Sequence, residues 1–231
     1  MKIGILEAGS PPGPLAKRFG SYGNMFRRLL GPAFKFEPFD AQGGVLPGAE
    51  DDCQAYLITG SSSGVYDGDP WIGAAEQFVR EQAGAKPMIG VCFGHQLMAQ
   101  ALGGEVIKSP KGWGLGVHRY ELAAKASWMD AGVAVGLPVS HQDQVVALGP
   151  EGQVLGGNAF TPFGLVHYPK LRAMSLQAHP EFEPDFVSAL IESRRGVAFE
   201  AEAADQAIES LKTPTDRRRV AVWMRRFFNT A

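Results

Sequence analysis

Cysteine is scarce in this sequence. Only two of the 231 residues are cysteines, Cys53 and Cys92. A disulfide framework or a cysteine-rich zinc site needs a larger, closely spaced set, so both are excluded. We expect no metal site and no cofactor, and each cysteine has to be judged by its own neighbours.

An excess of charge of either sign is also missing. The chain has 22 lysine and arginine residues against 24 aspartate and glutamate residues, a net charge of −2. Nucleic-acid-binding proteins usually carry a basic excess, so we expect no nucleic-acid partner. The one basic cluster is best interpreted as the solvated face of a terminal helix. Its members are Arg217, Arg218, Arg219, Arg225 and Arg226.

Long apolar runs are absent as well. No run approaches the ~20 apolar residues that a membrane-spanning helix needs. Residues 1–13 lack the long apolar region of a signal peptide and are typical of a buried first strand. We therefore expect no membrane partner and a cytoplasmic location. The hydrophobic fraction of 45% is that of a globular chain with a sizeable core.

Short apolar runs alternate with helical patterns in the first half of the chain. Strand-like runs lie at residues 2–6, 34–39, 56–59 and 88–92. Helical patterns lie at residues 22–30, 71–81 and 93–102, the last ended by two glycines and the second preceded by an Asp-Pro pair. This alternation predicts an α/β fold with a mainly parallel open sheet flanked by helices.

The second half begins with short runs separated by turns, at residues 105–107, 117–122, 154–156, 164–167 and 173–177. They predict a more antiparallel, hairpin-rich section. Helical patterns return at residues 186–193, 200–211 and 217–228. We expect a domain at residues 1–182 and a helical C-terminal extension at residues 183–231 that packs on the same domain. The apolar positions of the last helix are more typical of core than of a partner interface.

The segment Ile-Gly-Val-Cys-Phe-Gly-His-Gln, at residues 89–96, places Cys92 between a predicted strand and a predicted helix. Flanking Gly90 and Gly94 give it the pattern of a nucleophile elbow, where bulkier neighbours would clash. The helix N-terminus favours the thiolate, and the Phe93 amide could donate to an oxyanion. Taken alone, Cys92 is better interpreted as a small buried residue at the end of a strand. For Cys53 this is the only interpretation.

A thiolate nucleophile needs a base that can return a proton to the leaving group, and histidine suits this role near neutral pH. The chain contains His95, His118, His141, His167 and His179. His95 lies close to Cys92 in sequence, but its ring need not reach back. His179 precedes Pro180, which favours extended backbone, so Glu181 can lie on the same side and fix the tautomer. Taken alone, this segment is more typical of an ordinary turn.

Together, these two motifs resemble those of the triad-type, class-I glutamine amidotransferases. Two further segments stand in the family's order. Ile-Thr-Gly-Ser-Ser at residues 58–62 corresponds to its glycine-rich oxyanion loop, and Ser-His-Gln-Asp-Gln-Val at residues 140–145 is similar to its Ser-His-x-Asp segment. The resemblance covers most of the chain, to about residue 182. It implies a flavodoxin-like fold and a free-standing amidotransferase-like protein.

The resemblance implies a Cys-His-Glu catalytic triad that acts on the side-chain amide of glutamine. Cys92 would attack this amide and form a γ-glutamyl thioester. His179 would protonate the departing ammonia, and Glu181 would orient His179. The expected products are glutamate and ammonia.

The resemblance also implies supporting residues around the triad. Oxyanion donors would be the main-chain amides of Gly60, Ser61 and Phe93. Substrate contacts would come from Gln96, Ser140, His141 and Asp143, although His141 is equally well interpreted as structural. Many relatives have Gly-Gly-Pro in the oxyanion loop where this chain has Gly-Ser-Ser. A main-chain N–H survives that change, but the substrate side of the loop differs.

Three functions agree with these motifs. Only 49 residues follow residue 182 (231 − 182), too few for an ATP-dependent synthase domain, and no Walker motif is present. The chain could be a free-standing hydrolase of glutamine or of a γ-glutamyl compound such as a peptide. It could be the glutaminase subunit of a complex with a separate synthetase subunit. The third alternative, a non-catalytic binding or regulatory module, is disfavoured by the intact triad.

Overall fold

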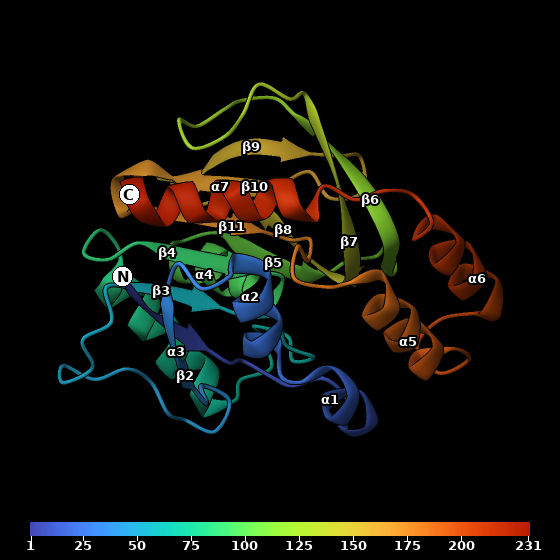
Figure 1. The fold of residues 1–231 in the computed structure, drawn as a ribbon, viewed down its shortest axis with the longest axis horizontal. Helices are drawn as coiled ribbons and strands as arrows, with labels where there is room; N and C mark the ends of the chain where they lie inside the picture. Colours follow the sequence, from blue (N-terminus) through green and yellow to red (C-terminus); the bar gives the residue numbers. More distant parts are fainter.

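A nine-stranded sheet forms the centre of the protein in the computed structural model, which describes residues 1–231 (Figure 1). Neighbouring strands of its first part are parallel, in the order β2 (Lys35–Phe39), β1 (Lys2–Leu6), β3 (Ala55–Ile58), β4 (Met88–Val91) and β11 (Ala173–Leu176). The sheet continues antiparallel through β10 (Leu165–Tyr168), β9 (Gln153–Gly157), β6 (Gly114–Leu122) and β7 (Ala134–His141). A separate antiparallel pair consists of β5 (Glu105–Lys108) and β8 (Asp143–Ala147). The predicted fold class is therefore confirmed.

Helices cover both faces of the sheet, which explains why the parallel strands β1, β3, β4 and β11 are almost wholly buried, whereas the edge strand β2 is not. One face packs against α2 (Tyr22–Leu30) and α7 (Arg217–Thr230). The other packs against α3 (Pro70–Gln82) and α4 (Phe93–Ala101). Figure 1 shows α7 lying along the front of the sheet. No helix combines the length and apolar character needed to cross a bilayer.

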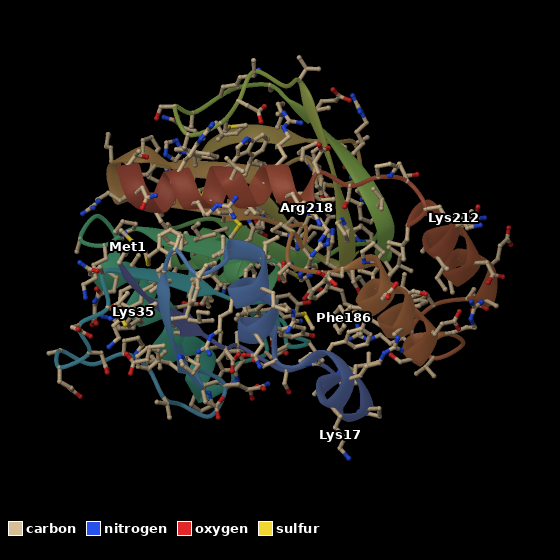
Figure 2. All side chains as sticks on the ribbon, in the orientation of Figure 1. Met1, Lys17, Lys35, Phe186, Lys212 and Arg218 are labelled. Atoms are coloured by element: carbon tan, nitrogen blue, oxygen red, sulfur yellow. The ribbon has the colours of Figure 1, made fainter.

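A third apolar cluster joins the beginning of the chain to its helical end. It contains residues of α2 and of α5 (Pro184–Arg194) and α6 (Ala201–Ser210), and α1 (Gly13–Phe19) packs beside it. Figure 2 shows Phe186 on the side of α5 that faces α2, whereas Lys17 and Lys212 project away from the protein. The division of the chain at residue 182 stays a prediction.

Four elements of the structure are not predicted by the sequence pattern: β7, β8, α1 and the short 3-10 helix at Pro169–Leu171. Within β7, Gly136 and Pro138 interrupt the apolar pattern. Proline is confined to edge strands, and β7 is the last strand of the sheet. The carbonyl of Pro138 accepts a hydrogen bond from the amide of His179 at 2.9 Å, so the missed strand helps to position a predicted site residue.

The interpretation of the C-terminal basic cluster was only partly right. Arg218 and Arg226 are exposed, but the other three arginines are half-buried and bound within the protein. Arg219, for example, binds the carboxylate of Asp130, with Nε 2.8 Å from Oδ2. The apolar face of α7 is core, as predicted. It consists of Val220, Trp223, Met224, Phe227 and Phe228, all at most 1% exposed.

Candidate active site

Cys92 stands in a strained turn between β4 and α4. Its φ of 54° and ψ of −104° lie in a region that residues other than glycine rarely adopt. A Cβ at Gly90 would lie 2.4 Å from the carbonyl oxygen of Gly94, and one at Gly94 would lie 2.4 Å from that of Ile58. Both glycines are therefore required, as the elbow pattern predicts. Strain of this kind, worth about 1–3 kcal/mol, is typical of functional sites.

His179 and Glu181 form a buried pair beside Cys92. The Nδ1 of His179 lies 2.7 Å from Oε1 of Glu181, and these residues are only 3% and 2% exposed. Phe182 stacks on the imidazole, with ring centres 3.9 Å apart and planes 4° apart. The segment is a turn, since β11 ends at Leu176, but the two side chains meet as their spacing predicts. The imidazole is therefore fixed on one face and at one nitrogen.

The charges around His179 favour its protonated form. Burial by itself lowers the pKa of His179, but the negative charges of Glu181 and Cys92 outweigh it and raise the pKa to about 10. The second carboxylate oxygen of Glu181 is buried without a hydrogen-bond partner. The imidazolium therefore provides the compensating charge for this buried carboxylate.

The loop after β3 lies against this pair. A Cβ at Gly60 would lie 3.0 Å from Cε1 of His179 and 3.7 Å from Cβ of Cys92, so a side chain there would crowd the imidazole. The amides of Gly60 and Ser61 donate to no acceptor within the protein. Phe93 is the first residue of α4, where amides have no intrahelical acceptor. These three amides are the predicted oxyanion donors.

A cavity of about 490 Å³ opens at Cys92. Of the predicted residues, it is lined by Ser61, Cys92, Gln96, Ser140, His141 and Asp143. A much smaller cavity, about 20 Å³, also reaches Cys92. It shares Ser61 and Ser140 with the larger cavity, and Gly60 and His179 are among its other lining residues. The structure thus brings all predicted substrate-contacting residues to one hollow that contains the nucleophile candidate.

Gln96 ties α4 to the wall of this cavity. Its Nε2 donates to the carbonyl of Asp143 at 2.9 Å and to Oε1 of Gln177 at 3.0 Å. Both of its N–H groups are therefore engaged within the protein, and a ligand could use only its Oε1. Burial raises the pKa of the Asp143 carboxyl, and the interaction with Tyr66 only partly offsets this rise.

Of the other histidine candidates, His118 and His167 line neither cavity at Cys92, whereas His95 and His141 are buried near it. His95 is fully buried, its Nδ1 lies 2.7 Å from Oγ of Ser175, and burial lowers its pKa to about 3. His141 lies on the cavity wall with its Nδ1 3.0 Å from the carbonyl of Asp143, and burial also lowers its pKa to about 3. Both rings are therefore neutral near pH 7, which favours the structural interpretation of His141.

Cys53 lies away from this cavity, just before β3. It is 2% exposed, its Sγ is 4.0 Å from Oε2 of Glu37, and burial raises the pKa of its thiol. No glycine turn surrounds it. The interpretation of Cys53 as a small buried core residue is consistent with these surroundings.

Several residues of the site are not predicted by any sequence motif. Arg194, at the end of α5, lines both cavities, and Trp113 and Lys108 line the larger one. Arg217 donates to the carbonyl of Pro180 at 2.8 Å and thereby holds the turn that carries His179. No motif marks these residues, because they reach the site from distant elements. In the sequence, only the basic cluster that contains Arg217 could have pointed to any of these residues.

Comparison with known proteins gives concordant results. Residues 36–189 match the family model described as Glutamine amidotransferase class-I. A glutamine amidotransferase-like protein of Schizosaccharomyces pombe is 27% identical, covering 97% of this chain and 97% of its own length. Gamma-glutamyl peptidase 4 of Arabidopsis thaliana is 26% identical, covering 81% of this chain and 79% of its own. The crystal structure of a glutamine amidotransferase from Thermotoga maritima superposes with a TM-score of 0.73 at 16% identity, covering 100% of this chain and 99% of that one.

Proposed function

Because this chain belongs to the class-I glutamine amidotransferase family, we propose that it hydrolyses the side-chain amide of glutamine to glutamate and ammonia. The observation that carries the proposal is the meeting of three groups: the strained Cys92, the buried His179–Glu181 pair and the free amides of Gly60 and Ser61. A nucleophile, an oriented acid–base group and oxyanion donors are the parts that acyl transfer requires.

In the first half of the reaction, the Cys92 thiolate attacks the amide carbon of glutamine. The carbonyl oxygen becomes an oxyanion and accepts hydrogen bonds from the amides of Ser61 and Phe93. His179 gives its proton to the nitrogen, the carbon–nitrogen bond breaks, and ammonia leaves. Glu181 stabilises the imidazolium before this transfer and holds the ring in place. The product is a γ-glutamyl thioester on Cys92.

In the second half, water attacks the thioester carbon and gives a proton to the neutral His179. The carbon–sulfur bond breaks, glutamate leaves, and Cys92 returns to a thiolate beside a protonated His179. One water is consumed for each glutamine.

A second candidate activity is the hydrolysis of γ-glutamyl peptides by the same triad. It is favoured by the volume of the cavity, about 490 Å³, which falls within the roughly 300–1,000 Å³ of sites that hold much larger ligands than glutamine. A relative over most of the chain is called a gamma-glutamyl peptidase. The chemistry is unchanged, except that an amine leaves in place of ammonia.

A separate synthetase subunit that takes up the ammonia stays a prediction, and so does the cytoplasmic location. The non-catalytic alternative requires that the Cys92–His179 pair serve no reaction. The strained backbone at Cys92 argues against this non-catalytic alternative, because strain of this kind persists only where the surrounding structure enforces it, and it is typical of functional sites.

The test of this proposal is the release of glutamate from glutamine and from γ-glutamylglycine by the purified chain. Cys92→Ala should lower both rates by several orders of magnitude and leave the thermal unfolding transition in place. Cys53→Ala is the matched control, since it also removes a buried thiol, and it should retain activity. An active Cys92→Ala protein beside an inactive Cys53→Ala protein would disprove the assignment.

A further inference from the structure

Arg194 is an arginine without an ionic partner at the junction of the two cavities. Its guanidinium makes no hydrogen bond and no ion pair within the protein, and lies 5.9 Å from the ring centre of Trp113. Its neighbour Arg195 instead pairs with Glu192 at 2.7 Å and Asp205 at 2.8 Å. The unpaired positive charge is therefore specific to Arg194 and is not shared by Arg195, the other arginine at the end of α5.

The segment around Arg194 is held in place by specific contacts. The carbonyl of Arg194 accepts hydrogen bonds from the amides of Val197 and Ala198 at 3.1 and 3.0 Å, which closes the turn that follows α5. Phe199 in that turn packs edge-on against Trp113, with ring centres 5.8 Å apart. The turn and the indole thus form one wall of the cavity, with the guanidinium in it.

The position of Arg194 relative to the triad indicates which part of a substrate it faces. Cys92, His179 and Arg194 together line the small cavity, and Arg194 extends from there into the wall of the larger one. In the proposed reaction His179 gives its proton to the leaving nitrogen, so a group that lines a cavity together with His179 lies near whatever is attached to that nitrogen. Glutamine has nothing there except hydrogen. A γ-glutamyl peptide has an amino acid there, which ends in a carboxylate.

We propose that Arg194 forms a carboxylate subsite for the leaving group, and that the preferred substrates are γ-glutamyl peptides with a free carboxylate on the residue after the glutamyl group. A guanidinium binds a carboxylate through two parallel hydrogen bonds, and it is the side chain best suited to that shape. This inference rests on the proposed function for the reaction, but the subsite itself is a binding property that can be measured without turnover.

The test compares ligands that differ only in the carboxylate. In the Cys92→Ala protein, titration calorimetry measures binding of γ-glutamylglycine, γ-glutamylglycinamide and glutamine. The first should bind about 10- to 150-fold more tightly than the second, the range for a hydrogen bond to a charged group. Adding Arg194→Gln should remove this preference and change glutamine binding less than threefold. Arg194→Lys should keep part of it.

The control is Arg119→Gln, which removes a positive charge from the exposed surface of β6. It should leave all three affinities unchanged. The proposal is overturned if Arg194→Gln weakens the peptide, its amide and glutamine equally, because Arg194 would then bind the α-carboxylate that all three share. It is also overturned if Arg194→Gln changes none of them. Absence of turnover by the unmodified protein would disprove the proposed function. The binding comparison would still show whether Arg194 binds the carboxylate of the leaving group.

Discussion

Replacing Glu181 by glutamine removes one negative charge beside His179 without changing the size of the side chain. In the structure this carboxylate makes a single side-chain hydrogen bond, to Nδ1 of His179 at 2.7 Å, and both groups are buried. A hydrogen bond to a charged group contributes about 1.5–3 kcal/mol. Glu181→Gln should therefore lower kcat/KM for glutamine by about 10- to 150-fold, less than His179→Asn.

The same change should alter the pH dependence in a defined direction. The pKa of His179 is raised to about 10, in spite of burial, because of the charges of Glu181 and Cys92. The stabilisation that protonated His179 gives the folded state is thus complete below about pH 6.5, its ordinary pKa, and is lost as the pH rises through about 10. Without the carboxylate, this loss and the alkaline decline of kcat/KM should both occur at lower pH.

Ammonia release measured from about pH 5 to about pH 10 gives the activity profile, and urea unfolding at the same pH values gives the stability. Glu202→Gln serves as a control, since it also removes one carboxylate but Glu202 is exposed on α6. The reasoning is refuted if Glu181→Gln leaves kcat/KM unchanged, or if its alkaline decline coincides with that of the unmodified protein.

Three further outcomes are expected from the contacts around the site. Gly94→Ala should destabilise the protein by about 1–3 kcal/mol, seen as a fall in Tm of about 2–4 °C for each kcal/mol, because the new Cβ would lie 2.4 Å from the Ile58 oxygen. An unchanged Tm would contradict this packing. His95→Asn should lower Tm but change kcat/KM far less than His179→Asn, and the reverse ranking would move the base to α4. Arg217→Gln should lower kcat about 10- to 100-fold at unchanged KM, as expected for a misplaced catalytic group; steady-state kinetics decides whether KM changes instead.

The parts that the sequence predicted correctly depend on short-range chemistry. Gly90 and Gly94 flank Cys92 because backbone atoms approach within 2.4 Å of where their side chains would be, and this need is visible in the sequence as two glycines. The spacing of His179 and Glu181 is also local, since two residues suffice to bring their side chains together. The alternation of strands and helices follows from apolar periodicity, which is a local property as well.

The missed parts depend on the assembled fold. Pro138 and Gly136 hide β7 from a pattern search, and only the place of this strand at the sheet edge makes the proline acceptable. Arg194 reaches the cavity from α5, and nothing in its own segment distinguishes it from Arg195. The difference between them is that carboxylates neutralise Arg195 in the folded protein, which a sequence does not reveal.

Covalent labelling of Cys92 tests the central claim most directly. A glutamine analogue with an electrophilic carbon at the amide position should react with the thiolate, and excess glutamine should slow the reaction by filling the same cavity. Mass spectrometry of the digested protein should find one label per chain, on Cys92, in the unmodified protein and in Cys53→Ala. A label on Cys53, or no label on Cys92 under conditions where free thiols react, would contradict the account and leave a binding protein with an amidotransferase fold.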